Sequence, residues 1–115
     1  MKREFKDYVA DIVDAIEKIE EFIQNRDFQD FKKDYKTVFA VIRALEIIGE
    51  AVKRIPDAIK TEYRQIPWRK IAGMRDKLIH DYSGVDIKVV WRTVKEDIPS
   101  IKPLFKEMLE KIKVE

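Results

Sequence analysis

Val38-Phe-Ala-Val-Ile-Arg-Ala-Leu-Glu-Ile-Ile-Gly-Glu-Ala-Val-Lys-Arg-Ile55 is the stretch that decides the fold. Its large apolar residues recur at steps of three and four, which places them on one face of an α-helix: Val38, Val41, Leu45, Ile48, Val52 and Ile55. A second, smaller apolar row runs beside the first: Ala40, Ala44, Ile47 and Ala51. A helix that is apolar around so much of its circumference must be covered on two sides.

The second row leaves two explanations open. Its alanines, together with Gly49, would let a helix of another copy approach closely, and on this interpretation the protein is a homodimer. Alternatively, the helix lies at the centre of a monomeric bundle and is covered only by its own chain.

Helical periodicity extends in both directions from this stretch. We expect helices from about Glu4 to Gln24, from Phe28 or Lys32 to Ile55, over Asp57 to Tyr63, from Trp68 to His80 or Tyr82, and from Ile87 to Lys113. Gly84 suits the end of the fourth helix, and Asp86 suits the N-cap of the last. Pro99 and Pro103 should kink the last helix or split it in two. The sequence therefore predicts an all-α, up-and-down bundle of four or five helices, a single domain over residues 1–115.

Composition excludes several classes of protein. No apolar run approaches the roughly 20 residues of a membrane-spanning helix, and the charged start has no apolar core of a signal peptide. The chain has no cysteine and one histidine, so we expect neither a structural metal site nor a cofactor bound through thiolates. We expect a soluble, cytoplasmic protein without metal or cofactor.

Positive charge is concentrated between Lys53 and Lys77. The net charge of the chain is only +2, but this segment holds eight basic residues against three acidic ones. Such a patch could attract phosphates, with Arg69, Lys70 and Lys77 as candidate RNA-binding residues. It could equally be the solvated face of a highly charged protein.

His80, the only histidine, follows Arg75 by five residues in Arg75-Asp-Lys-Leu-Ile-His80-Asp-Tyr82. Metal-independent RNA cleavage needs a group that removes the proton of the ribose 2′-OH, and histidine titrates near neutral pH. It also needs a fixed cation for the charge that develops on the phosphate oxygens, which an arginine can supply. Arg75 and His80 are therefore the candidate catalytic residues.

The spacing of this pair raises a difficulty. On an ideal helix, residues five apart point about 140° away from each other. Asp76 and His80 are four apart and share a face, so their side chains could form a hydrogen bond. Either the helix unwinds near His80, or the working site combines side chains from two protomers.

Three longer stretches resemble the HepT branch of the HEPN superfamily. They are Ile42-Arg-Ala-Leu-Glu-Ile-Ile-Gly-Glu-Ala51, Ile66-Pro-Trp-Arg-Lys-Ile-Ala-Gly-Met-Arg-Asp-Lys-Leu-Ile-His-Asp-Tyr82, and Gly84-Val-Asp86 with the Val90-Trp91 pair. The family motif of arginine, four residues, histidine, one residue and tyrosine reads here as Arg75, His80 and Tyr82. The resemblance implies a HEPN-like fold and a homodimeric ribonuclease toxin in which Arg75 and His80 are catalytic.

The resemblance also implies a partner and a modification. In such systems a small nucleotidyltransferase antitoxin of the MNT type transfers AMP from ATP to the motif tyrosine, here Tyr82. AMP at that position would occupy the phosphate site and add negative charge where RNA must enter. The bland alternative for Tyr82 is an aromatic residue that packs on the core, and the two roles are compatible.

Other residues could support the site. Asp76, Asp81 and Glu50 are candidates for orienting Arg75 or His80, although Glu50, like Glu46, could simply be solvated or bridge a dimer. Trp68 and Trp91 could stack on bases, but their apolar neighbours favour core positions. The alternative to an enzyme is a helical dimer without catalysis that binds nucleotides or presents Tyr82 to a nucleotidyltransferase.

Overall fold

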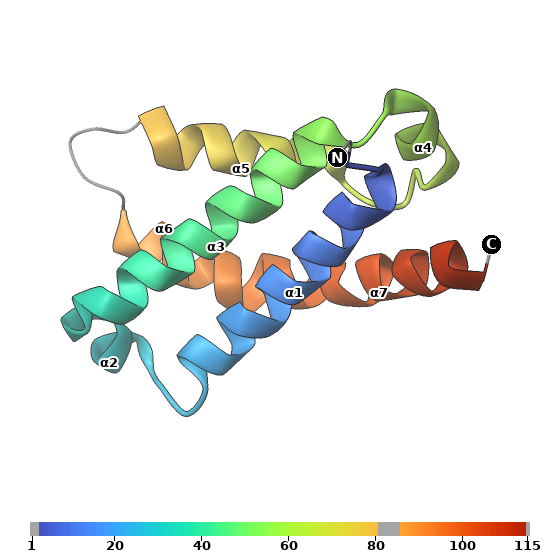
Figure 1. Cartoon of the computed structure of the whole chain (residues 1–115). Helices are drawn as coiled ribbons and strands as arrows, with labels where there is room; N and C mark the ends of the chain where they lie inside the picture. Colours follow the sequence, from blue (N-terminus) through green and yellow to red (C-terminus); the bar gives the residue numbers. More distant parts are fainter. Residues whose placement is uncertain (1–2, 81–85, 115) are drawn as a thin grey trace.

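Long helical segments run alternately up and down the molecule (Figure 1). The computed structural model describes residues 3–80 and 86–114, with side chains for 3–74 and 86–113. Its elements are α1 (Phe5–Ile23), α2 (Phe28–Lys33), α3 (Tyr35–Arg54), α4 (Asp57–Glu62), α5 (Trp68–His80), α6 (Ile87–Arg92), the π-helical η1 (Thr93–Asp97) and α7 (Ile98–Val114). All the regular elements in the described ranges are helical, which confirms the all-α prediction.

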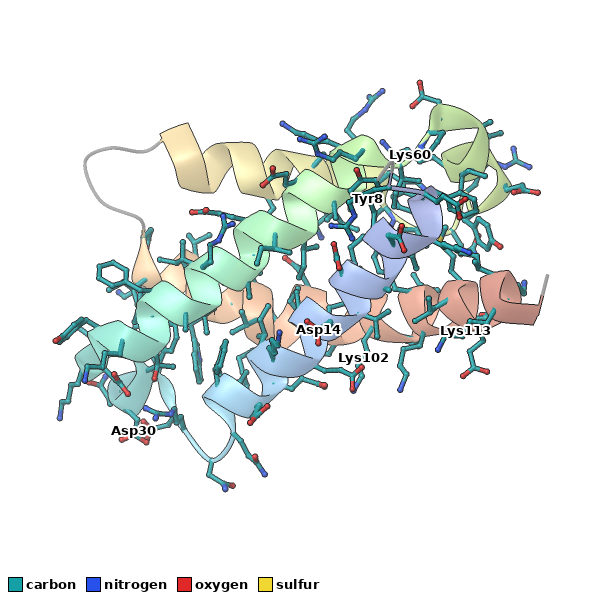
Figure 2. All side chains as sticks on the ribbon, viewed as in Figure 1. Tyr8, Asp14, Asp30, Lys60, Lys102 and Lys113 are labelled. Atoms are coloured by element: carbon teal, nitrogen blue, oxygen red, sulfur yellow. The ribbon has the colours of Figure 1, made fainter. Side chains whose placement is uncertain are left out.

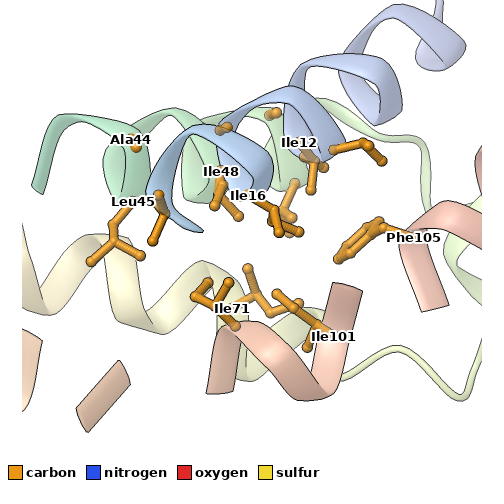
Figure 3. Packing of buried hydrophobic residues seen from close by; sticks show 14 of the residues in the cluster. Ile12, Ile16, Ala44, Leu45, Ile48, Ile71, Ile101 and Phe105 are labelled. Atoms are coloured by element: carbon orange, nitrogen blue, oxygen red, sulfur yellow. The ribbon is translucent and has the colours of Figure 1, made fainter. Parts of the chain in front are cut away.

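The core forms where four helices meet (Figure 3). Ile12 and Ile16 of α1 and Ile48 of α3 point into the same interior space, and Ile71 of α5 and Phe105 of α7 complete the cluster. All five side chains are at most 4% exposed. Burying an isoleucine or phenylalanine side chain contributes about 1.5–3 kcal/mol relative to leaving it in water. These contacts therefore fix the mutual positions of the helices.

The helix α3 is covered on two sides by its own chain. It packs along α1 and along α5, which lie on either side of it in Figure 1. Ala44 and Ala51, from the second apolar row, are each 5% exposed. Ile47 and Ala51 line a small hollow together with Tyr8 of α1. Ala44 and Ala51 are thus buried within the single chain, as in the monomeric-bundle alternative, while Ala40 and Ile47 are only half-buried.

The helix is interrupted at Asp34, where the sequence predicts that it continues. The Asp34 carboxylate accepts hydrogen bonds from the backbone N–H of Thr37 (3.3 Å) and from its hydroxyl (2.8 Å), so α3 begins with its own N-cap. Asp27 and Asp30 form a reciprocal capping box that starts α2. The predicted start at Phe28 is therefore wrong, and the alternative start at Lys32 is three residues early. The described residues form six helices, not four or five, if α6, η1 and α7 are counted as one.

The last helix is not split at its prolines. It runs from Ile87 to Val114 and contains the π-helical turn η1, whose ring is closed by a hydrogen bond from the Ile98 N–H to the Thr93 carbonyl. Proline in an ideal α-helix clashes with the carbonyl four residues earlier, and Pro99 directly follows the wider π turn. Asp86 caps α6 as predicted, through a 3.0 Å hydrogen bond from the Lys88 N–H.

Charged side chains cover the outer faces of the bundle (Figure 2). One of them, Lys102 of α7, forms a 2.7 Å ion pair with Glu20 of α1 and ties these two helices together. Within the described part of the chain, no helix is both long enough and apolar enough to cross a membrane.

Candidate active site

The helix α5 carries the candidate catalytic segment in its second half. Its first half is anchored in the core: the Trp68 indole N–H donates to the Tyr63 carbonyl (3.0 Å), and the ring meets Phe105 edge to face at 5.5 Å. Ile71 is only 4% exposed. Trp68 is thus half-buried and packs on the core, and these contacts anchor the first half of α5.

The backbone stays helical from Trp68 through His80. The helix therefore does not unwind before His80, and the positions Arg75 and His80 lie about 140° apart around its axis. Positions Asp76 and His80 share one face. The side chains of residues 75–80, and all of Asp81, Tyr82 and Gly84, lie outside the described residues, so the contacts predicted among them stay predictions.

The three candidate RNA-binding residues lie on the same helix. Arg69 is exposed in the first turn of α5. The Lys70 side chain is 70% exposed, and its ammonium group lies 3.4 Å from the carboxylate of Asp97 in η1. The backbone of Lys77 lies in the second half of α5, and its side chain is outside the described residues. Both Arg69 and Lys70 are therefore accessible to a phosphate, although Lys70 would have to exchange its carboxylate partner.

The glutamates of α3 have partners on their own helix. The Glu50 carboxylate lies 3.9 Å from Arg54, in the hollow beside α1 that also contains Arg3 and Tyr8. Glu46 pairs with Arg43 at 3.2 Å. The surface ion pair with Arg54 therefore offers another explanation for Glu50, beside the predicted role of orienting Arg75 or His80.

A hollow of about 330 Å³ lies beside α5, between this helix and the α6–η1–α7 helix. On the α5 side it is lined by Lys70, Ile71, Gly73 and Met74, the residues that lead up to Arg75. A Cβ added at Gly73 would meet nothing within 4 Å, so the space beside this residue is open. Sequence analysis missed the hollow, and its only sequence signal was a glycine inside a helical pattern.

Metal ligation has no visible basis in the described part of the chain. No group of three or more histidine, cysteine, aspartate or glutamate side chains comes together there in a way that could hold a metal ion.

Comparison with known proteins gives the family. Residues 12–108 match the family described as ribonuclease HepT-like. A protein of Thermococcus cleftensis named probable ribonuclease HepT is 61% identical over 94% of this chain and 98% of its own. Two further relatives bear provisional names as RNases: one from Methanocaldococcus jannaschii (44% identical over 96% of this chain and 92% of its own) and one from Caldanaerobacter subterraneus (42%, over 92% and 95%). No solved structure matches the chain. On these matches, the chain belongs to the HepT-like ribonuclease family.

Proposed function

We propose that this protein is the toxin of a HEPN/MNT toxin–antitoxin pair, an endoribonuclease that cleaves RNA without a metal through Arg75 and His80. One observation carries the proposal: the sequence motif of Arg75, His80 and Tyr82 occurs in a chain of the HepT-like ribonuclease family, and its Arg75 and His80 are backbone positions in the second half of α5. The motif holds the chain's only histidine.

The proposed reaction is an internal transfer at phosphorus. His80 takes the proton of the ribose 2′-OH, and the 2′-oxygen forms a bond to phosphorus as the bond to the 5′-oxygen breaks. The leaving 5′-oxygen takes up a proton, and the other product ends in a 2′,3′-cyclic phosphate. The Arg75 guanidinium stabilises the negative charge that gathers on the phosphate oxygens.

We infer that the working protein is a homodimer whose site uses both copies. Because α5 is helical through His80, Arg75 and His80 of one copy start from different faces, and a second copy offers a way to bring the two groups together. Tyr35 and Phe39 of α3 supply an apolar surface for such an interface. They are 66% and 67% exposed, and their rings form an edge-to-face pair at 6.3 Å.

We propose that a nucleotidyltransferase antitoxin silences the protein at Tyr82. The Tyr82 hydroxyl oxygen would attack the α-phosphorus of ATP, pyrophosphate would leave, and AMP would remain on the ring. Its phosphate would then compete with RNA for Arg75, seven residues before the modified tyrosine in the sequence.

Growth during induced expression tests the toxin proposal. The unmodified protein should arrest growth, and His80→Ala should abolish the arrest because removing a general base lowers the rate by about 10² to 10⁴-fold. Lys106→Ala, at an exposed position on α7, is the matched control and should remain toxic. Equal growth with the parent protein, His80→Ala and the control would contradict the proposal.

A second assay tests the role of Tyr82. Incubation with a nucleotidyltransferase of the MNT type and α-labelled ATP should label the parent protein, and Tyr82→Phe should remove the label. Tyr63→Phe, which keeps the backbone carbonyl that Trp68 uses, is the control and should be labelled normally. Full labelling of Tyr82→Phe would place the modification elsewhere.

A further inference from the structure

An aromatic hollow of about 440 Å³ opens on the surface of α6 and η1. We call it the Trp91 hollow; its lining residues are Phe28, Lys88, Trp91, Arg92, Lys95 and Glu96. The Trp91 ring lies 5.0 Å from the ring of Phe31, which is fully buried, and 6.2 Å from that of Phe28. The core therefore holds the indole in place, while part of it stays accessible at the surface.

Cations surround this ring. Lys88, Arg92 and Lys95 are all exposed, and the Lys95 ammonium group lies 5.4 Å from the centroid of the Trp91 ring. Lys88 and Arg92 form no side-chain hydrogen bond or ion pair with another residue that the structure describes. Glu96 is the one acid among the described residues of the lining. The hollow thus combines an accessible aromatic surface with a local excess of positive charge.

The acids next to Phe28 lie near one of these cations, because Asp27, Asp30 and Lys95 line a common neighbouring hollow. Asp27 and Asp30 each accept a hydrogen bond from the other's backbone N–H, at 2.8 and 3.2 Å, and so serve as the capping box of α2. Neither forms an ion pair with Lys95 within the described residues.

The Trp91 hollow adjoins the hollow beside α5. Arg92 and Glu96 line both of them, and Gly73 and Met74 form the α5 wall of the second hollow, directly before Arg75. A strand that passes the candidate catalytic segment could therefore follow this surface across Arg92 to Trp91.

We propose that the Trp91 hollow binds single-stranded RNA, with one base stacked on Trp91 and the flanking phosphates bound by Lys88, Arg92 and Lys95. The inference rests on the proposed ribonuclease function and extends it to a substrate-binding subsite outside the motif. Aromatic rings flanked by cations are the usual means of holding single strands, because every base has a face that can stack and every nucleotide carries a phosphate. A base-paired strand keeps its bases stacked within the helix and cannot offer one to the ring.

Salt-dependent RNA binding tests the proposal. A short fluorescein-labelled single-stranded RNA of mixed sequence is titrated with the full chain carrying His80→Ala, so that it stays intact, and anisotropy is followed at several KCl concentrations. Adding Lys88→Gln, Arg92→Gln and Lys95→Gln together should lower the affinity about tenfold or more. The slope of log K against log salt should fall by about 2, since each phosphate contact contributes about 0.7.

A control triple on α7 removes the same charge elsewhere. Lys106→Gln, Lys111→Gln and Lys113→Gln are all at exposed positions; Lys113 is labelled near the end of α7 in Figure 2. This triple should leave affinity and slope as in the parent. Equal effects of the two triples would overturn the proposal, because they would reflect net charge alone.

Fluorescence gives a readout that needs no change at Trp91, which packs on the core. The chain has two tryptophans, so Trp68→Phe leaves Trp91 as the only one. Single-stranded RNA should quench its emission, and duplex RNA of the same sequence should quench it less. Unchanged emission on RNA binding, or equal quenching by the duplex, would overturn the proposal.

The outcomes separate this inference from the proposed function. If the parent chain cleaves RNA but the Trp91-hollow triple binds like the parent, only the subsite is wrong. If the triple loses binding in the predicted way while the parent cleaves no RNA, the subsite stands and the ribonuclease proposal fails. Loss of binding to a nucleotidyltransferase with unchanged RNA binding would assign the hollow to a protein partner and overturn the RNA subsite.

Discussion

At the scale of single residues, Asp34 joins the start of α3 to the loop before α2. Its carboxylate accepts hydrogen bonds from Thr37 and pairs with Arg26 at 2.9 Å. These contacts hold the pKa of Asp34 below its ordinary value. The hydrogen bond from the Thr37 hydroxyl has the largest effect, followed by the one from the Thr37 backbone N–H and then by Arg26. The charged form is therefore favoured more strongly in the folded than in the unfolded chain.

This lowered pKa predicts a pH-dependent contribution to stability. An acid with a depressed folded-state pKa stabilises the fold fully above its unfolded-state pKa of about 4, and the contribution disappears as the pH falls through the folded-state value. Asp34→Asn, which can still cap α3 but cannot ionise, should be less stable than the parent at pH 7 and nearly equal to it in strong acid. Urea unfolding across this pH range measures the difference; a gap that stays constant below pH 4 would contradict the assignment.

Residue chemistry could be predicted from sequence only where a side chain is rare or part of a motif. His80 stands out because no other histidine competes with it, and Arg75 and Tyr82 stand out through the family motif. For Trp91 the sequence left base stacking and a core position open, because an apolar neighbourhood in sequence does not show which part of a ring α2 leaves uncovered. The exposed part of the ring depends on residues of α2, which are distant from Trp91 in the sequence.

At the scale of elements, α3 depends on small residues where α1 crosses it. Ala51 is 5% exposed, so a larger side chain there should overpack the α1–α3 contact and destabilise the fold by about 1–3 kcal/mol. We expect this for Ala51→Leu in denaturant unfolding. Ala10→Leu, at an exposed position on α1, is the control and should change stability little. Equal stabilities of the two variants would mean that α1 does not cover the second apolar row.

Periodicity predicted most helix bodies but not the two local departures from it. The large apolar row of α3 is buried as expected, because a repeat of three and four residues defines a face of the helix whatever lies opposite. The break at Asp34 depends on a side chain that caps the backbone instead of continuing the helix, and several acids nearby could have done so. The π turn before Pro99 depends on hydrogen-bond register, which residue spacing does not record.

At the scale of the whole molecule, the proposed dimer should depend on the exposed aromatic pair of α3. Tyr35→Ser with Phe39→Ser should convert a dimer into a monomer without unfolding it, since both rings are about two-thirds exposed in the single chain. Sedimentation velocity measures the change, and Lys36→Ser on the same helix is the control. A parent protein that is monomeric at high concentration, or a double variant that remains dimeric, would contradict this interface.

A site shared between copies makes a further prediction about mixed dimers. Arg75→Ala and His80→Ala should each be inactive, but a co-expressed mixture should recover activity, because the heterodimer keeps one site with Arg75 from one copy and His80 from the other. Differently tagged copies allow the heterodimer to be purified and assayed on RNA. Failure to recover activity would show that each copy must supply both groups itself.

Cleavage of RNA by the purified, unmodified protein tests the central claim most directly. With excess EDTA present, the parent should cut single-stranded RNA and leave 2′,3′-cyclic phosphate ends, detectable by mass spectrometry. His80→Ala should lower the rate by about 10² to 10⁴-fold and Arg75→Ala by about 10² to 10³-fold, with folding checked by circular dichroism. Intact RNA with the parent protein, or equal cleavage by all three proteins, would contradict the account.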